Sequence, residues 1–194
     1  MICHLCKNKV IKIITSELRQ GEKQNVYFCS RCKLGILNCN QSESDLKKFY
    51  TEEYRKKPTL TSQANPKELF NTFTPLQANR LKILKPYFTK KTKLLEVGCS
   101  AGMFLYQAKK HVGEIVGIDF DVTSAKYASK KCKCQIYTTE IKKTPLKLNY
   151  FDIIVAFQTL EHVSNPHNFI ATFKKYLKPG GIIAIEVPNL YDAL

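Results

Sequence analysis

The sequence predicts an α/β protein built on a doubly wound parallel sheet and preceded by a small cysteine-rich hairpin. Short apolar runs alternate with helical patterns from residue 93 onward, which is the order of elements in a parallel sheet covered by helices. A tight turn of small residues follows the first run, and two Cys-x2-Cys pairs stand near the start of the chain. We therefore expect a ribbon over residues 1–41, a helical linker or lid over 42–92 and the sheet domain over 93–194.

The composition is typical of a globular protein with a real core, since 44% of the 194 residues are apolar. No apolar run approaches the length of about 18 residues that a membrane-spanning helix needs. The first residues lack the apolar stretch of a signal peptide, so we expect a cytoplasmic protein. The net charge is +15, but nearly all of the 31 basic residues are lysine. Because arginine is favoured for phosphate recognition, a solvated lysine-rich surface is a simpler interpretation than a nucleic-acid surface.

Four cysteines form two pairs with metal-ligand spacing: Cys3, Cys6, Cys29 and Cys32. A two-residue spacer lets both thiolates of a pair reach one ion, and two such pairs complete a tetrahedron around zinc. The residues between the pairs are typical of two strands joined by a polar turn, a hairpin too small for a core of its own. We therefore predict a zinc ribbon with a closed, structural site. The alternatives are four buried free thiols, or His4 or Cys39 as a substitute ligand.

The segment after the ribbon changes to helical patterning. Residues 42–54 carry capping signals followed by apolar residues at helical spacing. The polar stretch that follows is the best linker candidate. Pro66 then opens a second helical region through Tyr87, which we expect to bend or break near Pro75 because proline removes a backbone hydrogen bond.

The sheet domain is predicted from runs of strand length and runs of helical spacing. Strands are expected at 93–98, 114–120, 134–139, 151–157 and 180–188. Helices are expected at 102–112, 122–131 and 165–178. In such sheets, ligands bind at the carboxyl ends of the strands, where the strand order reverses. The loops after the strands should therefore carry the chemistry.

The turn after the first strand of the sheet is the first candidate binding element. It runs from Glu96 through Gly98 and Ser100 to Gly102. It lacks the glycines of a nicotinamide fingerprint and the lysine of a phosphate loop. Its small residues suit close approach of the backbone to a cofactor, with Glu96 facing an amino group. Asp119 ends the next strand at about the spacing at which an acidic side chain takes ribose hydroxyls.

Four stretches of the chain resemble, in order, the motifs of class I S-adenosylmethionine-dependent methyltransferases: LLEVGCSAG, GIDFD, FDIIVAFQTLEHVSNP and LKPGGIIAIEVPN. The resemblance covers roughly residues 93–190 and implies a Rossmann-like fold that binds S-adenosylmethionine. With its cysteine pairs, the whole chain is similar to bacterial methyltransferases encoded among surface-polysaccharide genes and to deoxysugar C-methyltransferases. The family usually has glycine where Ser100 stands. Its sheet has seven strands, whereas this sequence stops after the fifth, as a piece of a longer enzyme or an unusually short one would.

The resemblance also implies roles for individual residues. The turn after the first strand would hold the methionine part of the cofactor, and the end of the second strand would bind ribose and adenine. The loops after the third and fourth strands would frame the adenine edge and close the methionine end. The residues implied to bind the cofactor are Glu96, Gly98, Cys99, Ser100, Gly102, Asp119, Phe120, Glu140, Ile141, Phe157 and Gln158. Glu161 and His162 would face the acceptor.

The expected chemistry is displacement of a methyl group from a sulfonium, in which alignment of the acceptor atom does much of the work. A hydroxyl acceptor benefits from a base, and a carbon acceptor requires one. His162 is the best-placed base, because histidine changes its charge near neutral pH. A structural role for His162 at a loop–helix junction is an equal alternative. A metal site formed by Glu161 and His162 is a third.

We therefore predict a methyltransferase that acts on a small molecule, a sugar that is nucleotide-linked or part of a surface glycan. The methyl group would go to a hydroxyl or to a carbon. One alternative is an RNA methyltransferase whose basic first half grips the phosphate backbone. Another is a binding module that holds cofactor or a partner without catalysis.

Overall fold

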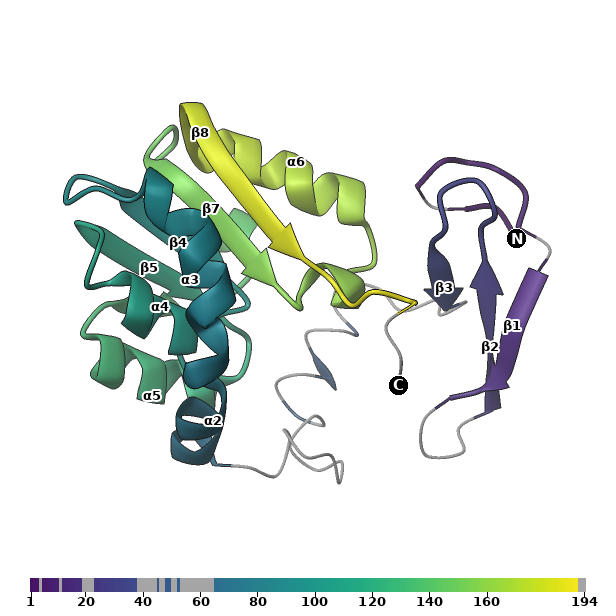
Figure 1. Ribbon diagram of the computed structural model, residues 1–194, viewed down its shortest axis with the longest axis horizontal. Helices are drawn as coiled ribbons and strands as arrows, with labels where there is room; N and C mark the ends of the chain where they lie inside the picture. Colours follow the sequence, from purple (N-terminus) through teal and green to yellow (C-terminus); the bar gives the residue numbers. More distant parts are fainter. Residues whose placement is uncertain are drawn as a thin grey trace. The chain divides into compact units, whose positions relative to one another are not determined.

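The computed structural model, drawn in Figure 1, describes residues 1–3, 5–10, 12–18, 23–37, 45, 48–49, 52 and 65–191. The chain divides into two compact units: the ribbon unit, Met1–Ser42 with Pro188–Leu194, and the sheet unit, Glu43–Val187. The predicted helix over 42–54 lies largely outside the described residues, as do His4, Cys39 and nearly all of the predicted linker. None of the described helices is long and apolar enough to cross a membrane.

The ribbon unit contains a three-stranded antiparallel sheet in the order β1-β2-β3. Its strands are β1 (Lys12–Glu17), β2 (Lys23–Phe28) and β3 (Gly35–Leu37). The first two are the predicted hairpin, whereas β3 is an addition that the sequence did not indicate. All of β1 is exposed, and the unit's buried cluster consists of two cysteines with Val10 and Ile36. The apolar core of this unit is therefore small.

A stretch of chain that follows the sheet unit packs onto the ribbon. The ring of Tyr191 meets the ring of Phe28 edge to face, with 6.4 Å between their centroids. A Cβ added to Gly35 would lie 3.2 Å from Cδ1 of Leu190, so the glycine lets Leu190 lie close to β3. Residues far apart in the sequence thus share the packing of this unit.

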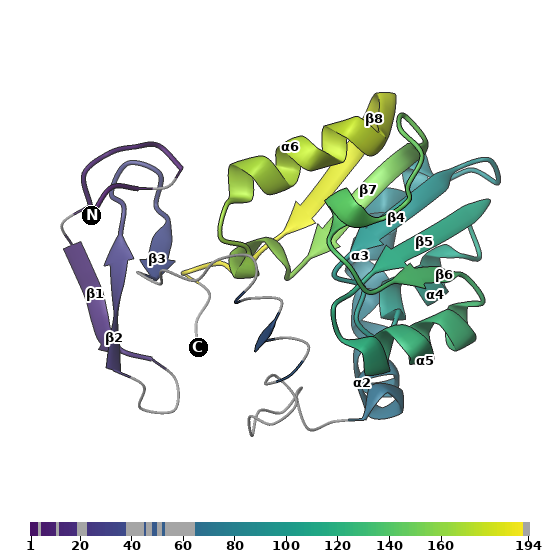
Figure 2. The ribbon, with the colours of Figure 1, turned by 180° about the vertical axis from the view of Figure 1, so that it is seen from behind.

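The sheet unit is built on five parallel strands in the order β6-β5-β4-β7-β8. The strands, seen in Figure 2, are β4 (Lys93–Val97), β5 (Glu114–Ile118), β6 (Gln135–Tyr137), β7 (Phe151–Phe157) and β8 (Leu177–Glu186). The predicted fold class is confirmed, and each of the five predicted strands is present. Because the strand order reverses between β4 and β7, a ligand site is expected at their carboxyl ends.

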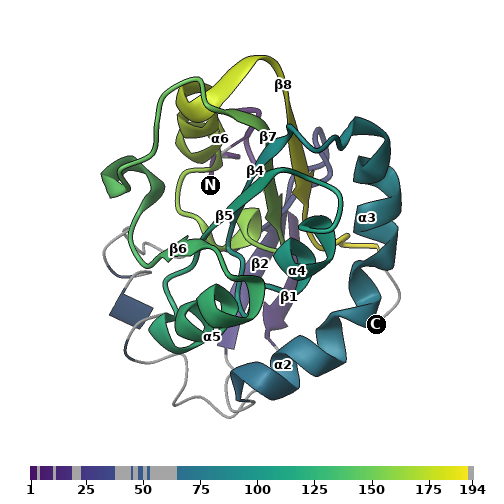
Figure 3. The same ribbon diagram turned by 90° about the vertical axis from the view of Figure 1, so that its left-hand side faces the viewer.

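Helices cover both faces of this sheet (Figure 3). Leu94 and Ile153 pack against α3 (Ala78–Leu84), α4 (Met103–Ala108) and α5 (Val122–Cys132), whereas their neighbours Leu95 and Ile154 pack against α6 (Pro166–Tyr176). Successive strand residues point to opposite faces, so one apolar run serves both layers. The helices are α2 (Pro66–Phe73), η3 (Pro75–Gln77), α3 (Ala78–Leu84), η4 (Lys85–Tyr87), α4 (Met103–Ala108), α5 (Val122–Cys132), η5 (Ile141–Lys143), η6 (Leu160–His162) and α6 (Pro166–Tyr176).

The helical segment follows its sequence signals closely. α2 begins at Pro66 behind a capping box, in which Asn65 Oδ1 accepts from the Glu68 N–H at 2.9 Å and Glu68 accepts from the Asn65 N–H at 3.1 Å. The helix breaks before Pro75 and continues as η3 and α3, as predicted.

Several elements differ by one to four residues from their predicted bounds, and α4 and β8 are two of them. α4 ends at Ala108, short of the predicted residue 112, because the chain turns and the amides of Gly113 and Glu114 both donate to the carbonyl of Thr92. β8 begins at Leu177, directly after α6, where the sequence predicted that the helix would run through residue 178 and the strand would begin at residue 180.

Candidate functional site

A cavity of about 980 Å³ opens at the carboxyl ends of the strands in the sheet unit. Residues at the ends of β4, β5, β7 and β8 line it, together with residues of α2, η3 and α3. It therefore lies at the reversal of strand order, where a doubly wound sheet binds its ligand.

The turn after β4 adopts a backbone that favours glycine. Gly98 has a φ of +81° and Ser100 a φ of +46°, which lie in the left-handed region. A Cβ on Gly98 would lie 2.1 Å from Oγ1 of Thr159, so only glycine lets Thr159 approach the turn. The left-handed backbone of Ser100 costs about 1–2 kcal/mol, because a residue with a Cβ is crowded there.

Asp119 ties this turn to the end of β5. Its Oδ2 accepts from the backbone N–H of Ser100 at 2.6 Å, and its Oδ1 accepts from that of Asp121 at 2.8 Å. Each carboxylate oxygen can accept more than one hydrogen bond, and Asp119 lines the cavity. The arrangement is compatible with the predicted contact to ribose hydroxyls and gives Asp119 a second task, which is to shape the turn.

Glu96 is a buried acid at the cavity, with 4% of its surface exposed. Its Oε2 has no hydrogen-bond partner among the described residues. Burial raises the pKa of Glu96 well above its usual value, and the charge of Arg80 opposes this rise. Because a buried acceptor without a partner is costly, Glu96 fits a ligand that brings an N–H or O–H donor to this point.

The other predicted cofactor residues, with one exception, also line the cavity: Cys99, Phe120, Glu140, Ile141, Phe157 and Gln158. The exception is Gly102, which has a φ of +81° at the start of α4. A Cβ there would lie 2.9 Å from Sγ of Cys132 and 3.0 Å from Cβ of Ala128. The structure assigns Gly102 to close packing between α4 and α5 and not to the cavity wall.

The two residues predicted to face the acceptor are placed differently. His162 lines the cavity and its side chain is 53% exposed, whereas Glu161 is not among the lining residues. The His162 Nε2 and Glu161 Oε1 atoms lie 3.8 Å apart, too far for a hydrogen bond. In the described part of the chain, no third His, Cys, Asp or Glu forms a ligand cluster with them. The metal alternative therefore has an incomplete ligand set.

The four predicted metal ligands come together in the ribbon unit. The Sγ atoms of Cys3, Cys6, Cys29 and Cys32 all lie within 4.8 Å of one another. The distances from Cys3 to Cys32 and from Cys6 to Cys29 are both 3.5 Å between sulfurs. Sulfurs bound to one zinc at about 2.3 Å would lie about 3.8 Å apart. The cluster therefore has the size of a tetrahedral zinc site.

Both cysteine pairs adopt the same turn. The N–H of Lys7 donates to the carbonyl of Cys3 at 3.0 Å, and that of Lys33 donates to the carbonyl of Cys29 at 2.8 Å. Both lysines have a positive φ, 59° and 61°. A hydrogen bond from the Cys32 backbone lowers the pKa of the Cys29 thiol to about 6, whereas burial raises the pKa of the Cys32 thiol to about 12. Cys29 is therefore the thiol of this pair that forms a thiolate first, the form that metals bind.

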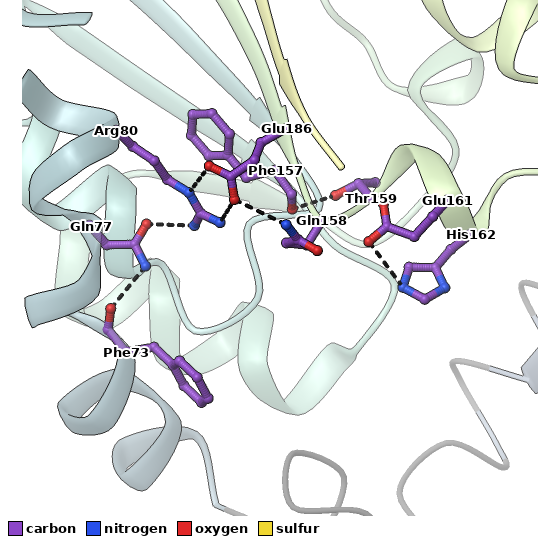
Figure 4. Close-up of polar contacts among 9 residues, drawn as sticks. All are labelled: Phe73, Gln77, Arg80, Phe157, Gln158, Thr159, Glu161, His162 and Glu186. Carbon is purple, nitrogen blue, oxygen red and sulfur yellow. Dashed lines mark hydrogen bonds and ion pairs between the residues drawn. The ribbon is translucent and has the colours of Figure 1, made fainter. Parts of the chain in front are cut away.

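Sequence reasoning missed a polar network on the cavity wall, drawn in Figure 4. Arg80 of α3 pairs with Glu186 at the end of β8, and Gln77 and Gln158 each hydrogen-bond one member of the pair. Arg80, Gln77, Gln158 and Glu186 all line the cavity. Of these, only Gln158 was predicted. A charged residue that follows the apolar run of β8 was the one signal available.

Comparisons with known proteins agree with this site. Residues 95–185 match the family model described as a methyltransferase domain. The chain is 32% identical over 101 residues to phosphoethanolamine N-methyltransferase 1 of Zea mays, a match that covers 48% of this chain and 20% of that protein. It is 30% identical over 116 residues to the ubiquinone biosynthesis O-methyltransferase of Coxiella burnetii, covering 57% of this chain and 50% of that protein. The match thus spans half or less of these relatives.

A solved structure shares the same architecture. The SAM-dependent methyltransferase from Aquifex aeolicus is similar with a TM-score of 0.53 and 26% identity, covering 63% of this chain and 72% of that one. The strand order, the cavity at the strand ends and the matched segment therefore lead to one conclusion. Residues 95–185 match the model of a methyltransferase domain, and the sheet unit has the Rossmann-like α/β fold of the class I methyltransferases.

Proposed function

We propose that the protein transfers a methyl group from S-adenosylmethionine to a hydroxyl or carbon of a sugar, either nucleotide-linked or part of a surface glycan. The observation that carries the cofactor assignment is Glu96, whose Oε2 is buried at the cavity without a partner among the described residues. The ammonium group of the cofactor's methionine part would supply the donor that this oxygen lacks.

The residues of the chain would divide the work of binding and transfer. S-adenosylmethionine would supply the methyl group from its sulfonium. Asp119 would accept from the ribose hydroxyls, Phe120 would lie against the adenine, and the residues after β6 would frame its edge. Phe157 and Gln158 would close the methionine end. His162 is exposed enough to take a proton from the acceptor and release it to solvent.

The sugar acceptor is supported by the resemblance of the chain to bacterial polysaccharide methyltransferases. The matched relatives are named for other acceptors, phosphoethanolamine in Zea mays and ubiquinone precursors in Coxiella burnetii. Arg80 and Lys142 are the Lys and Arg side chains among the described lining residues, and Arg80 is paired with Glu186. Such a lining favours an acceptor without a phosphate group beside His162, since phosphate recognition calls for available arginines.

Calorimetric titration with S-adenosylhomocysteine tests the cofactor assignment. Asp119→Ala should weaken binding by about 1.5–3 kcal/mol, because two hydroxyls lose a charged acceptor. Equal affinity of the wild type and the variant would contradict this placement of the ribose. Transfer of labelled methyl to a panel of nucleotide sugars, phosphoethanolamine and ubiquinone precursors then tests the acceptor. Methylation of phosphoethanolamine in preference to every sugar would overturn the sugar assignment.

The two alternatives predicted from the sequence lead to different outcomes. An RNA methyltransferase should bind unstructured RNA below micromolar concentration at about 150 mM salt. We expect weak binding that salt abolishes, because the basic residues are mostly lysines. A binding module would hold the cofactor but transfer no methyl group to any acceptor. The substitution His162→Gln would then leave cofactor binding unchanged.

We further propose that the four-cysteine cluster holds one structural zinc ion. The sulfur distances support this assignment, and four thiolates leave no open position for a reaction. The site needs reduced cysteines, which fits the predicted cytoplasmic location. Elemental analysis should find about one zinc per chain. Protein that is fully folded and free of metal would exclude the site.

A further inference from the structure

A two-armed ion pair joins α3 to the end of β8 beside the cavity (Figure 4). Nε of Arg80 donates to Oε2 of Glu186 at 2.9 Å, and a terminal nitrogen of the guanidinium contacts Oε1. Arg80 is also held from its own side, because it donates to Oε1 of Gln77 at 2.8 Å. Gln77 in turn donates to the carbonyl of Phe73 at 2.9 Å. The pair therefore links α2 and α3 to the strand ends.

The same pair contacts the two residues at the end of β7. The guanidinium carbon of Arg80 lies 4.6 Å from the centroid of the Phe157 ring. Nε2 of Gln158 donates to Oε1 of Glu186 at 3.1 Å, and the backbone N–H of Gln158 donates to the Glu186 carbonyl at 2.8 Å. Gln158 has a φ of +50°, a backbone that persists only where the surroundings hold it. Glu186 holds Gln158 through both its backbone and its side chain.

The position of the ion pair between Arg80 and Glu186 suits a role at the cavity better than a role in stabilising the fold. The two side chains are 21% and 40% exposed. Partly exposed ion pairs contribute about 0.2–1 kcal/mol to folding free energy, and two-armed arginine–carboxylate pairs lie at the upper end of that range. The hydrogen bond from Arg80 lowers the pKa of Glu186 below its usual range, so the carboxylate stays charged at neutral pH. A charged pair that gives little stability but contacts two cavity residues is better explained by what it positions.

We propose that Arg80 and Glu186 are positioning residues, which hold Phe157 and Gln158 in place at the methionine end of the cavity and fix α3 beside the strand ends. This inference rests on the proposed function, because Phe157 and Gln158 are assigned there to the cofactor. The pair acts through these neighbours and needs no contact with the cofactor of its own. Exchanging the two charges should therefore preserve much of the site, since the Gln158 amide can turn its oxygen toward an arginine.

The charge exchange provides the test. Arg80→Glu and Glu186→Arg alone should each weaken S-adenosylhomocysteine binding at least about tenfold, since a displaced binding residue has effects of this size. The double variant should recover most of that loss. In the ligand-free protein, the amide of Gln158 should exchange with solvent faster in each single variant and return toward the wild-type rate in the double variant.

Lys178→Glu is the matched control. It breaks the ion pair between Lys178 of β8 and Asp152 of β7, whose nitrogen and oxygen atoms lie 2.6 Å apart. The two side chains are 37% and 34% exposed, which is similar to the exposure of Arg80 and Glu186. Neither residue lines the cavity. It should leave both S-adenosylhomocysteine affinity and Gln158 exchange unchanged, whatever it does to the unfolding temperature.

Three results would overturn the inference. If Arg80→Glu and Glu186→Arg each bind S-adenosylhomocysteine like the wild type, the pair positions nothing. A double variant that binds as weakly as the singles, with Gln158 exchange restored, would mean that Arg80 acts on the ligand directly. Gln158 exchange that is insensitive to all these variants would also refute it. If the wild type does not bind S-adenosylhomocysteine at all, the proposed function fails, and the exchange rates still decide the role of the pair.

Discussion

The ribbon unit and the sheet unit differ in the interactions that stabilise each of them internally. The buried cluster of the ribbon unit has four members, two of which are thiols of the cysteine cluster. The sheet unit has a larger buried cluster on each face of its sheet. Apolar burial stabilises by about 25 cal/mol per Å², so a cluster as small as that of the ribbon cannot offset the entropy of ordering its chain. A set of metal ligands can replace a core, and the unit then depends on the metal.

The largest expected effect is the unfolding of the ribbon unit, with no change in the folding of the sheet unit. Cys29→Ala removes one of four ligands, and structural zinc contributes about 10–16 kcal/mol of binding free energy in comparable small domains. Zinc should be lost, and the ribbon should no longer give a folded signal in amide exchange. The sheet unit should keep its thermal transition. Cys134→Ala, outside the cluster, is the control and should retain the metal.

A substitution in the core of the sheet unit should destabilise that unit and leave the ribbon unit unchanged. Phe104 is 1% exposed and packs edge to face on Phe157 with 4.9 Å between centroids. Phe104→Ala should destabilise the sheet unit by about 3–5 kcal/mol, since it leaves a cavity in a packed core. Urea unfolding measures this loss. The zinc content should stay the same. Loss of zinc in Phe104→Ala would show that the stability of the ribbon unit depends on that of the sheet unit.

Glu96 is an acid buried in the sheet unit, which is otherwise stabilised by apolar packing. Burial raises its folded pKa well above the usual 4.5, so the folded state retains a proton that the unfolded chain releases. Its contribution to stability should therefore fall as the pH rises from 4.5 toward the folded pKa. Glu96→Gln should flatten that decline in urea unfolding.

The same variant should also weaken S-adenosylhomocysteine binding by about 1.5–3 kcal/mol, because an ammonium group loses a charged acceptor. Wild-type affinity should rise with pH over that range, as Glu96 must give up its proton to receive the ammonium. A pH dependence of affinity that persists in Glu96→Gln would assign the titration to another group.

The smallest expected effect concerns the cap of α2. Asn65→Ala removes the side chain that accepts from the Glu68 N–H and should cost about 1 kcal/mol. Denaturant unfolding detects a change of this size. Lys67→Ala, at an exposed position in the same turn, should change stability by less than about 0.5 kcal/mol. If both variants cost the same, the cap has no special role.

The fold was predictable where the signal was local. The run over 151–157 is apolar at every position except Asp152, as expected of a strand buried on both faces, and the cysteine spacing placed all four thiols in one cluster. β3 was missed because three residues, Gly35–Leu37, carry too little pattern to identify a strand. The site was predictable in its strand-end residues, such as Asp119, because these follow the apolar runs directly.

The rest of the site depends on contacts that sequence patterns do not record. Arg80 and Glu186 are 106 residues apart, and nothing near either residue indicates its partner. Gly102 belongs to the predicted turn, but only the packing of α5 shows that its missing side chain makes room for Cys132. Such residues are found from the geometry of neighbouring elements.

The packing of Leu190 and Tyr191 on the ribbon makes that unit discontinuous, with the sheet unit, Glu43–Val187, inserted between its two parts. Synthesis on a ribosome proceeds from the first residue to the last. The four cysteines therefore emerge early, whereas Leu190 and Tyr191 emerge only after every strand of the sheet. The four-cysteine cluster can form while translation continues, but the packing of the ribbon unit is completed last. Its final contacts thus form only after the five described strands of the sheet unit have been synthesised.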